Sequence, residues 1–351
     1  MRMRFKKGYL VFAAVLVLCA PLGIDAKKKI SYDGMIRATA EGQEKIHITV
    51  GIVRNDSQSY AVYGKDGIEE MGSPSYEYEI GSITKTFTSS LLAKSLSERK
   101  IRLDDTIEQY LDIESRDYYP TILQLATHTS GYGQMNHAPM LLNAMKGRNP
   151  LMAFNREDMV RQVQRTRLSC DVHEWEYSNF GIAILGVALS ESYGSTYPEL
   201  MESYIRNDLK LQHTHVARGR GEIADYWEWN PDDVYIAAGG LVSNISDMMD
   251  YARIQMNEEK PYLSLAHRKH APVDPKQFED AAIDGMGLGW ILDGSHGVIW
   301  HDGGTDNHNS YLGFSRDKRI AVVVLANTPD DFRYSARDIG ANLLLSLMQR
   351  N

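Results

Sequence analysis

Residues 76–85 read Tyr-Glu-Tyr-Glu-Ile-Gly-Ser-Ile-Thr-Lys, and the first structural prediction follows from their order. Aromatic or aliphatic residues alternate with glutamates from Tyr76 to Ile80, which predicts a short strand. Gly81 allows a sharp turn, and apolar residues at helical spacing over 86–96 predict a helix after it. We therefore expect Ser82 between a strand and the first turn of a helix.

Lys85 is an unusual residue for the start of a helix. A serine placed like Ser82 most often caps the helix, and a capping box would have Glu or Gln three residues later. The dipole at a helix N-terminus disfavours a cation by about 0.3–1 kcal/mol. The same field, together with burial, would lower the pKa of Lys85 and give a neutral amine that accepts a proton from Ser82. The pair predicts an activated serine nucleophile, with helix capping as the alternative.

The Ser-x-x-Lys pattern occurs twice more, at 97–100 and at 315–318. The first copy lies in a charged stretch. The second lies between two apolar runs, where the turn of a hairpin is expected. Both copies are predicted to be solvent-exposed surface.

Tyr177-Ser178-Asn179 directly precedes a helical pattern over 181–193, so Ser178 or Asn179 is a candidate N-cap. A tyrosine beside a neutral lysine can also pass a proton to and from a serine oxygen. An asparagine amide can orient that lysine or hold a substrate amide. Tyr177 and Asn179 are therefore candidate site residues.

His301-Asp302-Gly303-Gly304 ends a short apolar strand. Glycines at a strand end commonly mark a turn or bulge, and a lone histidine is commonly structural. As a binding edge, the glycines would let a substrate backbone approach, and the N–H of Gly304 would join that of Ser82 in an oxyanion hole. His301 is expected to be neutral near pH 7 and to gain charge below about pH 6.5.

The first 26 residues have the features of a secretory signal, with four cations, an apolar run and a candidate cleavage site after Ala26. An uncleaved anchor is the alternative. Loss of residues 1–26 removes four cations and one anion, which changes the formal net charge from −8 to −11. Such an acidic chain argues against nucleic acid or an anionic membrane surface as partner.

Cysteine and histidine usage predicts neither a disulfide nor a metal site. Cys170 is the single cysteine after residue 26 and is expected to be a buried apolar residue. His213 and His215 alternate as two ligands on a strand would, but no Asp, Glu or Cys completes a spaced set. No metal and no cofactor are expected.

The two ends of the chain predict strands, and its middle predicts helices. The expected strands are 46–54, 59–63, 290–292, 298–301, 310–314 and 320–326, and a helix follows over 330–348. Clear helical patterns in the middle lie at 181–193 and 197–209.

The expected fold class is α+β, with an antiparallel sheet built from both chain ends and flanked by helices. The sheet subdomain is expected over about 27–121 and 267–351, and a mostly helical subdomain over about 122–266 is inserted into it. The three site signals would then meet at the junction of the two, where clefts are common.

Five segments support a family resemblance. They are 80–87, 121–131, 175–181, 238–243 and 287–290. From about residue 33 to its C-terminus the chain resembles the serine β-lactamase and penicillin-recognising DD-peptidase superfamily, in the branch around class C β-lactamases, D-aminopeptidases and related esterases. The resemblance implies an acylated nucleophile at Ser82, proton-transfer partners at Lys85 and Tyr177, and a positioning role for Asn179. It also implies that 301–304 is the substrate-binding strand.

One departure from the family pattern concerns the substrate. Class C β-lactamases carry Lys-Thr-Gly where this chain has His301-Asp302-Gly303. The missing cation and hydroxyl weaken the case for a β-lactam carboxylate, and Asp302 would repel one if its side chain points inward.

The leading hypothesis is an exported hydrolase that forms an acyl-enzyme and cleaves a peptide, amide or ester bond. Its substrate would be a small molecule or a cell-wall peptide with a D-amino-acid centre. A class C-like β-lactamase is one alternative, and a sensor that binds a penicillin or peptide without turnover is the other.

Overall fold

The computed structural model describes residues 31–68, 73–133, 138–169, 172–274, 283–329 and 333–349. The secretory signal and Cys170 lie outside these ranges, so the expectations for them stay predictions. Among the described helices, none combines the length and the apolar character needed to cross a membrane.

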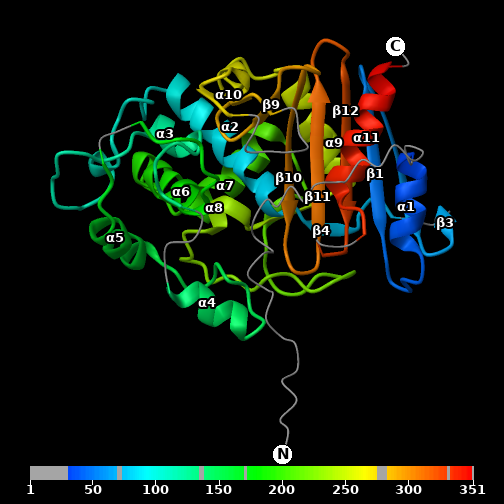
Figure 1. Cartoon of the computed structure of the whole chain (residues 1–351), viewed down its shortest axis with the longest axis horizontal. Helices are drawn as coiled ribbons and strands as arrows, with labels where there is room; N and C mark the ends of the chain where they lie inside the picture. Colours follow the sequence, from blue (N-terminus) through cyan, green and yellow to red (C-terminus); the bar gives the residue numbers. More distant parts are fainter. Residues whose placement is uncertain are drawn as a thin grey trace, which may run out of the picture.

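Both ends of the chain build one nine-stranded antiparallel sheet, in the order β3-β2-β1-β12-β11-β10-β9-β8-β7 (Figure 1). Its strands are β1 (Ile48–Arg54), β2 (Ser57–Gly64), β3 (Gly67–Ile68), β7 (Ala271–Pro272), β8 (Gly285–Met286), β9 (Ile291–Asp293), β10 (Val298–Gly304), β11 (Asn309–Ser315) and β12 (Ile320–Ala326). Ile48 of β1 lies opposite Ala326 of β12, which joins the N-terminal and C-terminal strands. The predicted α+β fold with a sheet from both chain ends is confirmed.

Local sequence explains the two strands at this join. Asn55 takes a positive φ of 54°, as the asparagine of a tight hairpin turn does, so β2 already starts at Ser57. The apolar run of β12 is buried along its whole length because helices cover both faces of the sheet.

The helices are α1 (Tyr32–Ala40), α2 (Thr84–Ser97), α3 (Ile122–Ala126), α4 (Ala138–Met145), α5 (Arg156–Arg165), α6 (Asn179–Tyr193), α7 (Tyr197–Ser203), α8 (Ile236–Gly239), α9 (Ile245–Met256), α10 (Leu263–His267) and α11 (Ala336–Gln349). Helices α1 and α11 cover one face of the sheet, and α9 packs on β1, β11 and β12 from the other face. Helix α9 lies in the range expected for the helical subdomain, and the subdomain boundaries stay predictions.

Helix α6 is the centre of the helical part. Every residue from Asn179 to Leu189 is buried, and α2, α3, α7 and α8 surround the helix. A second sheet has three strands in the order β4-β6-β5, and it contacts α7 through β5 and α9 through β6. Strand β4 (Glu77–Glu79) is the strand predicted before Ser82, whereas β5 (His215–Val216) and β6 (Leu241–Asn244) were not predicted.

Three local predictions need correction. Helix α11 starts at Ala336 instead of residue 330, because Ser335 and Asp338 cap each other through their side chains and backbone N–H groups. The predicted helix over 197–209 is α-helical only to Ser203 and continues as a π-helix over Tyr204–Leu209. Ser315 is buried at the end of β11, although the turn that follows it is exposed as expected.

Candidate active site

Ser82 lies in η1 (Gly81–Ile83), the single 3-10 turn that connects β4 to α2. Its Oγ accepts a hydrogen bond of 2.8 Å from Lys85 Nζ and one of 2.7 Å from Tyr177 Oη. The residue that caps α2 is Ile83, which has no capping hydrogen bond from its side chain. Ser82 therefore faces two proton-carrying groups instead of capping its helix.

Lys85 is completely buried. Besides Ser82, its Nζ donates to the carbonyl oxygen of Ala238 in α8 at 2.6 Å, and it lies 4.9 Å from the centre of the Tyr177 ring. Burial lowers the pKa of Lys85 well below its ordinary value, although the charge of Asp302 partly opposes this. The environment therefore favours the neutral amine that the sequence predicts.

Tyr177 and Asn179 flank the start of α6. Ser178 is the N-cap, and its Oγ accepts a hydrogen bond of 2.9 Å from Gly181 N, which confirms the capping alternative for this residue. Asn179 is the first residue of α6 and only 3% exposed. Its role in holding a substrate amide stays a prediction.

The N–H group of Gly304 lies beside the turn that carries Ser82. The backbone N–H of Thr305 points toward β11 and donates to His308 O at 2.8 Å. Neighbouring residues of an antiparallel strand point their N–H groups to opposite sides of the strand. The N–H of Gly304 therefore points away from β11. A Cβ atom built on Gly81 would lie 2.6 Å from Gly304 N. The structure thus brings Gly304 N next to the residue before Ser82.

Two glycines make this close approach possible. Gly81 has a φ of +47°, which disfavours any side chain. A Cβ atom on Gly303 would lie 2.1 Å from Ile80 O and 2.7 Å from Ser82 N. The backbone of β10 therefore packs directly against the backbone of η1, as an oxyanion hole built from both would need.

His301 and Asp302 point to opposite faces of β10. His301 pairs with Leu312, whose side chain belongs to the core on the α2 side, and Asp302 pairs with Tyr311, which packs on α11. The side chain of Asp302 is therefore directed to the other face of the sheet from Ser82. Asp302 would repel a substrate carboxylate only if its side chain pointed inward, and it does not.

His301 is 1% exposed, and its Nδ1 lies 2.6 Å from the carbonyl oxygen of Asp302. Because a carbonyl only accepts, Nδ1 carries the proton. Burial lowers the pKa of His301 to about 4, although the carboxylate of Asp302 partly opposes this shift. The expectation that His301 gains charge below about pH 6.5 is wrong, because desolvation keeps the ring neutral at that pH.

Sequence reasoning missed two groups at this site. Ala238 O, which holds Lys85, and His128, whose ring lies 4.8 Å from that of Tyr177, are both in segments quoted for the resemblance, but neither received a role. A backbone carbonyl leaves no signal in a sequence. His128, by contrast, could have been named as a candidate site residue from its residue type.

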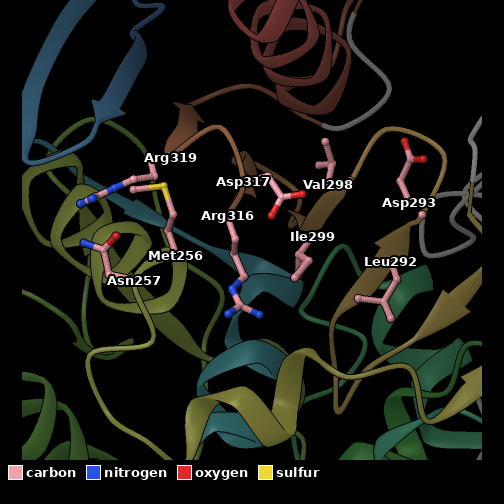
Figure 2. Close-up of a pocket in the computed structure, with 11 residues that line it drawn as sticks. Met256, Asn257, Leu292, Asp293, Val298, Ile299, Arg316, Asp317 and Arg319 are labelled. Carbon is pink, nitrogen blue, oxygen red and sulfur yellow. The ribbon is translucent and has the colours of Figure 1, made fainter.

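A cavity of about 760 Å³ opens at the other end of β10 (Figure 2). Its lining includes Val298, Ile299, Arg316 and the end of α9 at Met256. Its nearest lining residue on this strand, Ile299, lies four positions before Gly303, about 13 Å at the rise of a β-strand. It is thus separate from Ser82. Within the described ranges, His, Cys, Asp and Glu side chains form no group that could hold a metal ion.

Comparison with known proteins agrees with this geometry. The chain is 23% identical over 372 residues to a beta-lactamase of Pseudomonas fluorescens, which covers 91% of this chain and 98% of that protein. Its fold is similar to that of a beta-lactamase/D-alanine carboxypeptidase from Yersinia pestis, with a TM-score of 0.72, 18% identity, and coverage of 90% and 95% of the two chains. It is also similar to a D-stereospecific amidohydrolase from a Streptomyces species, with a TM-score of 0.66, 21% identity, and coverage of 88% and 96%.

The sequence model named "Beta-lactamase" matches residues 38–346, which is most of the chain. This match confirms the resemblance inferred from the five sequence segments. The chain is a hydrolytic enzyme that belongs to the beta-lactamase family of serine hydrolases.

Proposed function

We propose that this enzyme cleaves a peptide, amide or ester bond through an acyl-enzyme on Ser82. One observation carries the proposal: the Ser82 hydroxyl lies within 2.8 Å of Lys85 Nζ and within 2.7 Å of Tyr177 Oη. A serine hydroxyl is a weak nucleophile unless an adjacent base takes its proton. Here two such groups converge on it, and one of them is a buried amine with a lowered pKa.

The proposed reaction has two halves. As Ser82 Oγ attacks the carbonyl carbon, its proton passes to Lys85 or to Tyr177, and the N–H groups of Ser82 and Gly304 bind the developing oxyanion. The proton then goes to the leaving group, which departs and leaves the acyl-enzyme. In the second half, a water molecule gives a proton to the same base and attacks the acyl carbon. The bond to Ser82 Oγ then breaks, Ser82 takes the proton, and the acyl group leaves as a carboxylic acid. Whether Lys85 or Tyr177 is the base is left open, because both lie at hydrogen-bond distance.

We propose substrates at a D-amino-acid centre, such as D-amino-acid amides or cell-wall peptides. The names of the carboxypeptidase and the amidohydrolase with similar folds support this class. The buried, neutral His301 also supports it, because the strand lacks the fixed cation that would attract a β-lactam carboxylate. A β-lactamase is the second candidate, favoured by the relative from Pseudomonas fluorescens. Export by the N-terminal segment is part of the proposal, since cell-wall substrates lie outside the cytoplasm.

Active-site labelling tests the nucleophile. A fluorophosphonate probe should add its mass to the peptide that contains Ser82, and Ser82→Ala should abolish the labelling without loss of secondary structure. Ser97→Ala is the matched control, because Ser97 begins an exposed second copy of the Ser-x-x-Lys pattern. Labelling at another serine, or labelling that persists in Ser82→Ala, would refute the assignment.

Turnover of a substrate panel separates the candidate functions. The panel contains D-Ala-D-Ala peptides, D-amino-acid amides, short-chain esters and a chromogenic cephalosporin. We expect steady turnover of the amides, peptides or esters and slow turnover of the cephalosporin. Fast cephalosporin turnover would favour a β-lactamase, and an acyl-enzyme that forms and then stalls would favour a sensor.

A further inference from the structure

His128 holds the Tyr177 segment from both sides. Its carbonyl oxygen accepts a hydrogen bond of 2.9 Å from the backbone N–H of Glu176, and its Nδ1 accepts one of 3.1 Å from the backbone N–H of Ser178. These donors are the residues immediately before and after Tyr177. One histidine therefore fixes both peptide groups around the tyrosine.

The ring of His128 also contacts the tyrosine ring itself. The two ring centres are 4.8 Å apart with their planes tilted by 33°, and the ring of Trp175 packs edge-on against His128 at 6.1 Å. His128 is 1% exposed, so water does not compete for these contacts. The ring thus limits where the Tyr177 side chain can turn.

The backbone of His128 is unusual. Its φ is +59°, a left-handed conformation that costs a non-glycine residue about 1–2 kcal/mol. This conformation follows α3 and lets the carbonyl and the ring of one residue reach the same neighbouring segment. Strain of this kind persists where the surroundings hold it, often at functional sites.

His128 is suited to accept a hydrogen bond in its neutral form. Because Nδ1 accepts from Ser178 N–H, the ring proton lies on Nε2, and a doubly protonated ring could not accept at all. Burial lowers the pKa of His128 well below its ordinary value. The contact with Ser178 is therefore kept at neutral pH.

We propose that His128 is a positioning residue for catalysis: its Nδ1 and carbonyl oxygen clamp the backbone on either side of Tyr177 and hold the tyrosine hydroxyl against Ser82 Oγ. The inference rests on the proposed role of Tyr177 in proton transfer. His128 acts through Tyr177 and touches no reacting atom. It is separate from the capping of α6, which Ser178 Oγ provides.

Two isosteric substitutions test the acceptor atom. In His128→Asn the amide oxygen can occupy the position of Nδ1 and accept from Ser178 N–H, whereas the longer side chain of His128→Gln places its oxygen near the position of Nε2. We expect the acylation rate of a chromogenic ester to stay within about fivefold of wild type in His128→Asn. In His128→Gln we expect kcat to fall by about 100-fold with little change in KM, since one lost proton-transfer group is worth about 10²–10⁴. His267→Gln, at the last residue of α10, is the control for the loss of a buried histidine.

A double-mutant cycle with Tyr177→Phe separates positioning from general destabilisation. Without the tyrosine hydroxyl there is nothing to position, so His128→Gln should lower kcat by less than about threefold in the Tyr177→Phe background. A full additional loss there would overturn the inference, as would an Asn variant that is folded and as slow as the Gln variant. If both variants fail to fold, His128 is a folding residue and the inference is also wrong. If Tyr177→Phe alone keeps the wild-type rate, the proposed role of Tyr177 fails first.

Discussion

Lys85 breaks a local rule of helix formation and supplies the reactive group of the proposed site. An ammonium in the first turn of α2 is disfavoured by the helix dipole and by complete burial. In the described part of the chain, its amine forms hydrogen bonds only with Ser82 and with the carbonyl oxygen of Ala238. We infer that this position lowers the stability of the fold in return for an activated serine.

Lys85→Met is therefore expected to be inactive and more stable than wild type. Because burial lowers the pKa of Lys85, the unfolded chain binds one proton more than the folded chain between the folded and unfolded pKa values. Over that range, the wild-type free energy of unfolding should rise with pH by up to about 1.4 kcal/mol per unit. The advantage of the Met variant should shrink accordingly toward about pH 10. Urea unfolding of both proteins between about pH 7 and 10 measures it.

Lys85→Arg is the charge-retaining control for this prediction. Arginine stays protonated at any working pH and cannot act as a base, so acylation should be as slow as in Lys85→Met. Near wild-type acylation by the Arg variant would mean that Lys85 acts only as a charge. A stability advantage of Lys85→Met that does not change with pH would mean that the folded and unfolded chains protonate Lys85 alike.

At the scale of residues, the sequence predicts what is local. Ser82 and Lys85 are three positions apart, so helical geometry alone brings them together. Ala238 and His128 act across 153 and 50 residues, and the second contact also depends on a left-handed backbone. No spacing rule carries such information. Proton-transfer chemistry, the expected junction of the two subdomains and the resemblance brought Tyr177 and the 301–304 strand to Ser82 in the sequence analysis.

At the scale of elements, strand β10 determines which side chains reach the site. Its alternation directs His301 toward the α2 side and Asp302 toward α11. The two residues that replace Lys-Thr of class C β-lactamases therefore have different surroundings. Only the first of them shares a face with Ser82.

His301→Lys should raise the rate of acylation by a cephalosporin by about tenfold, because an ammonium attracts the substrate carboxylate and a neutral imidazole does not. Adding Asp302→Thr should change this rate by less than about twofold, since Asp302 points to the other face. The pKa of His301 is about 4, so its protonation should produce no rise in wild-type acylation between about pH 8 and 5. Stopped-flow acylation rates for the wild type and both variants test the point. A clear further gain on adding Asp302→Thr would place the substrate carboxylate on the α11 side.

The sequence predicts long apolar strands and misses the shortest ones. The seven residues of β12 form a continuous apolar run and were predicted with their correct bounds. Strands β5, β7 and β8 have two residues each, which is too short for any alternation to be visible. Their pairing depends on neighbours brought in by the rest of the fold.

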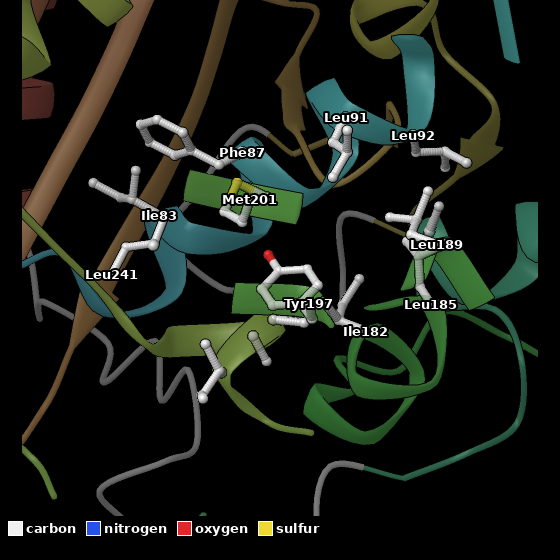
Figure 3. Packing of buried hydrophobic residues seen from close by; sticks show 14 of the residues in the cluster. Ile83, Phe87, Leu91, Leu92, Ile182, Leu185, Leu189, Tyr197, Met201 and Leu241 are labelled. Atoms are coloured by element: carbon white, nitrogen blue, oxygen red, sulfur yellow. The ribbon is translucent and has the colours of Figure 1, made fainter. Parts of the chain in front are cut away.

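At the scale of the whole molecule, one hydrophobic core connects the sheet with the helical part. It contains Leu312 and Val323 from the sheet together with buried residues of α2, α6, α7 and α9. Figure 3 shows Phe87 of α2 close to Met201 of α7, in the cluster that also contains Leu91 of α2 and Leu185 of α6. Helix α2, which begins two residues after Ser82 at Thr84, therefore lies in the interior shared by both parts.

This shared core predicts that the two parts unfold together. Ser82 and Gly304 lie where β10 meets η1, and Tyr177 lies at the start of α6, so the arrangement around Ser82 exists only when both parts are folded. In urea, the loss of helical circular dichroism and the loss of fluorophosphonate labelling should have the same midpoint. Amide exchange in β1 and β12 should report the same free energy as global unfolding, because their pairing joins the two chain ends. Labelling that disappears at a lower urea concentration, while the exchange protection of β1 and β12 remains, would show instead that the helical part opens independently of the sheet.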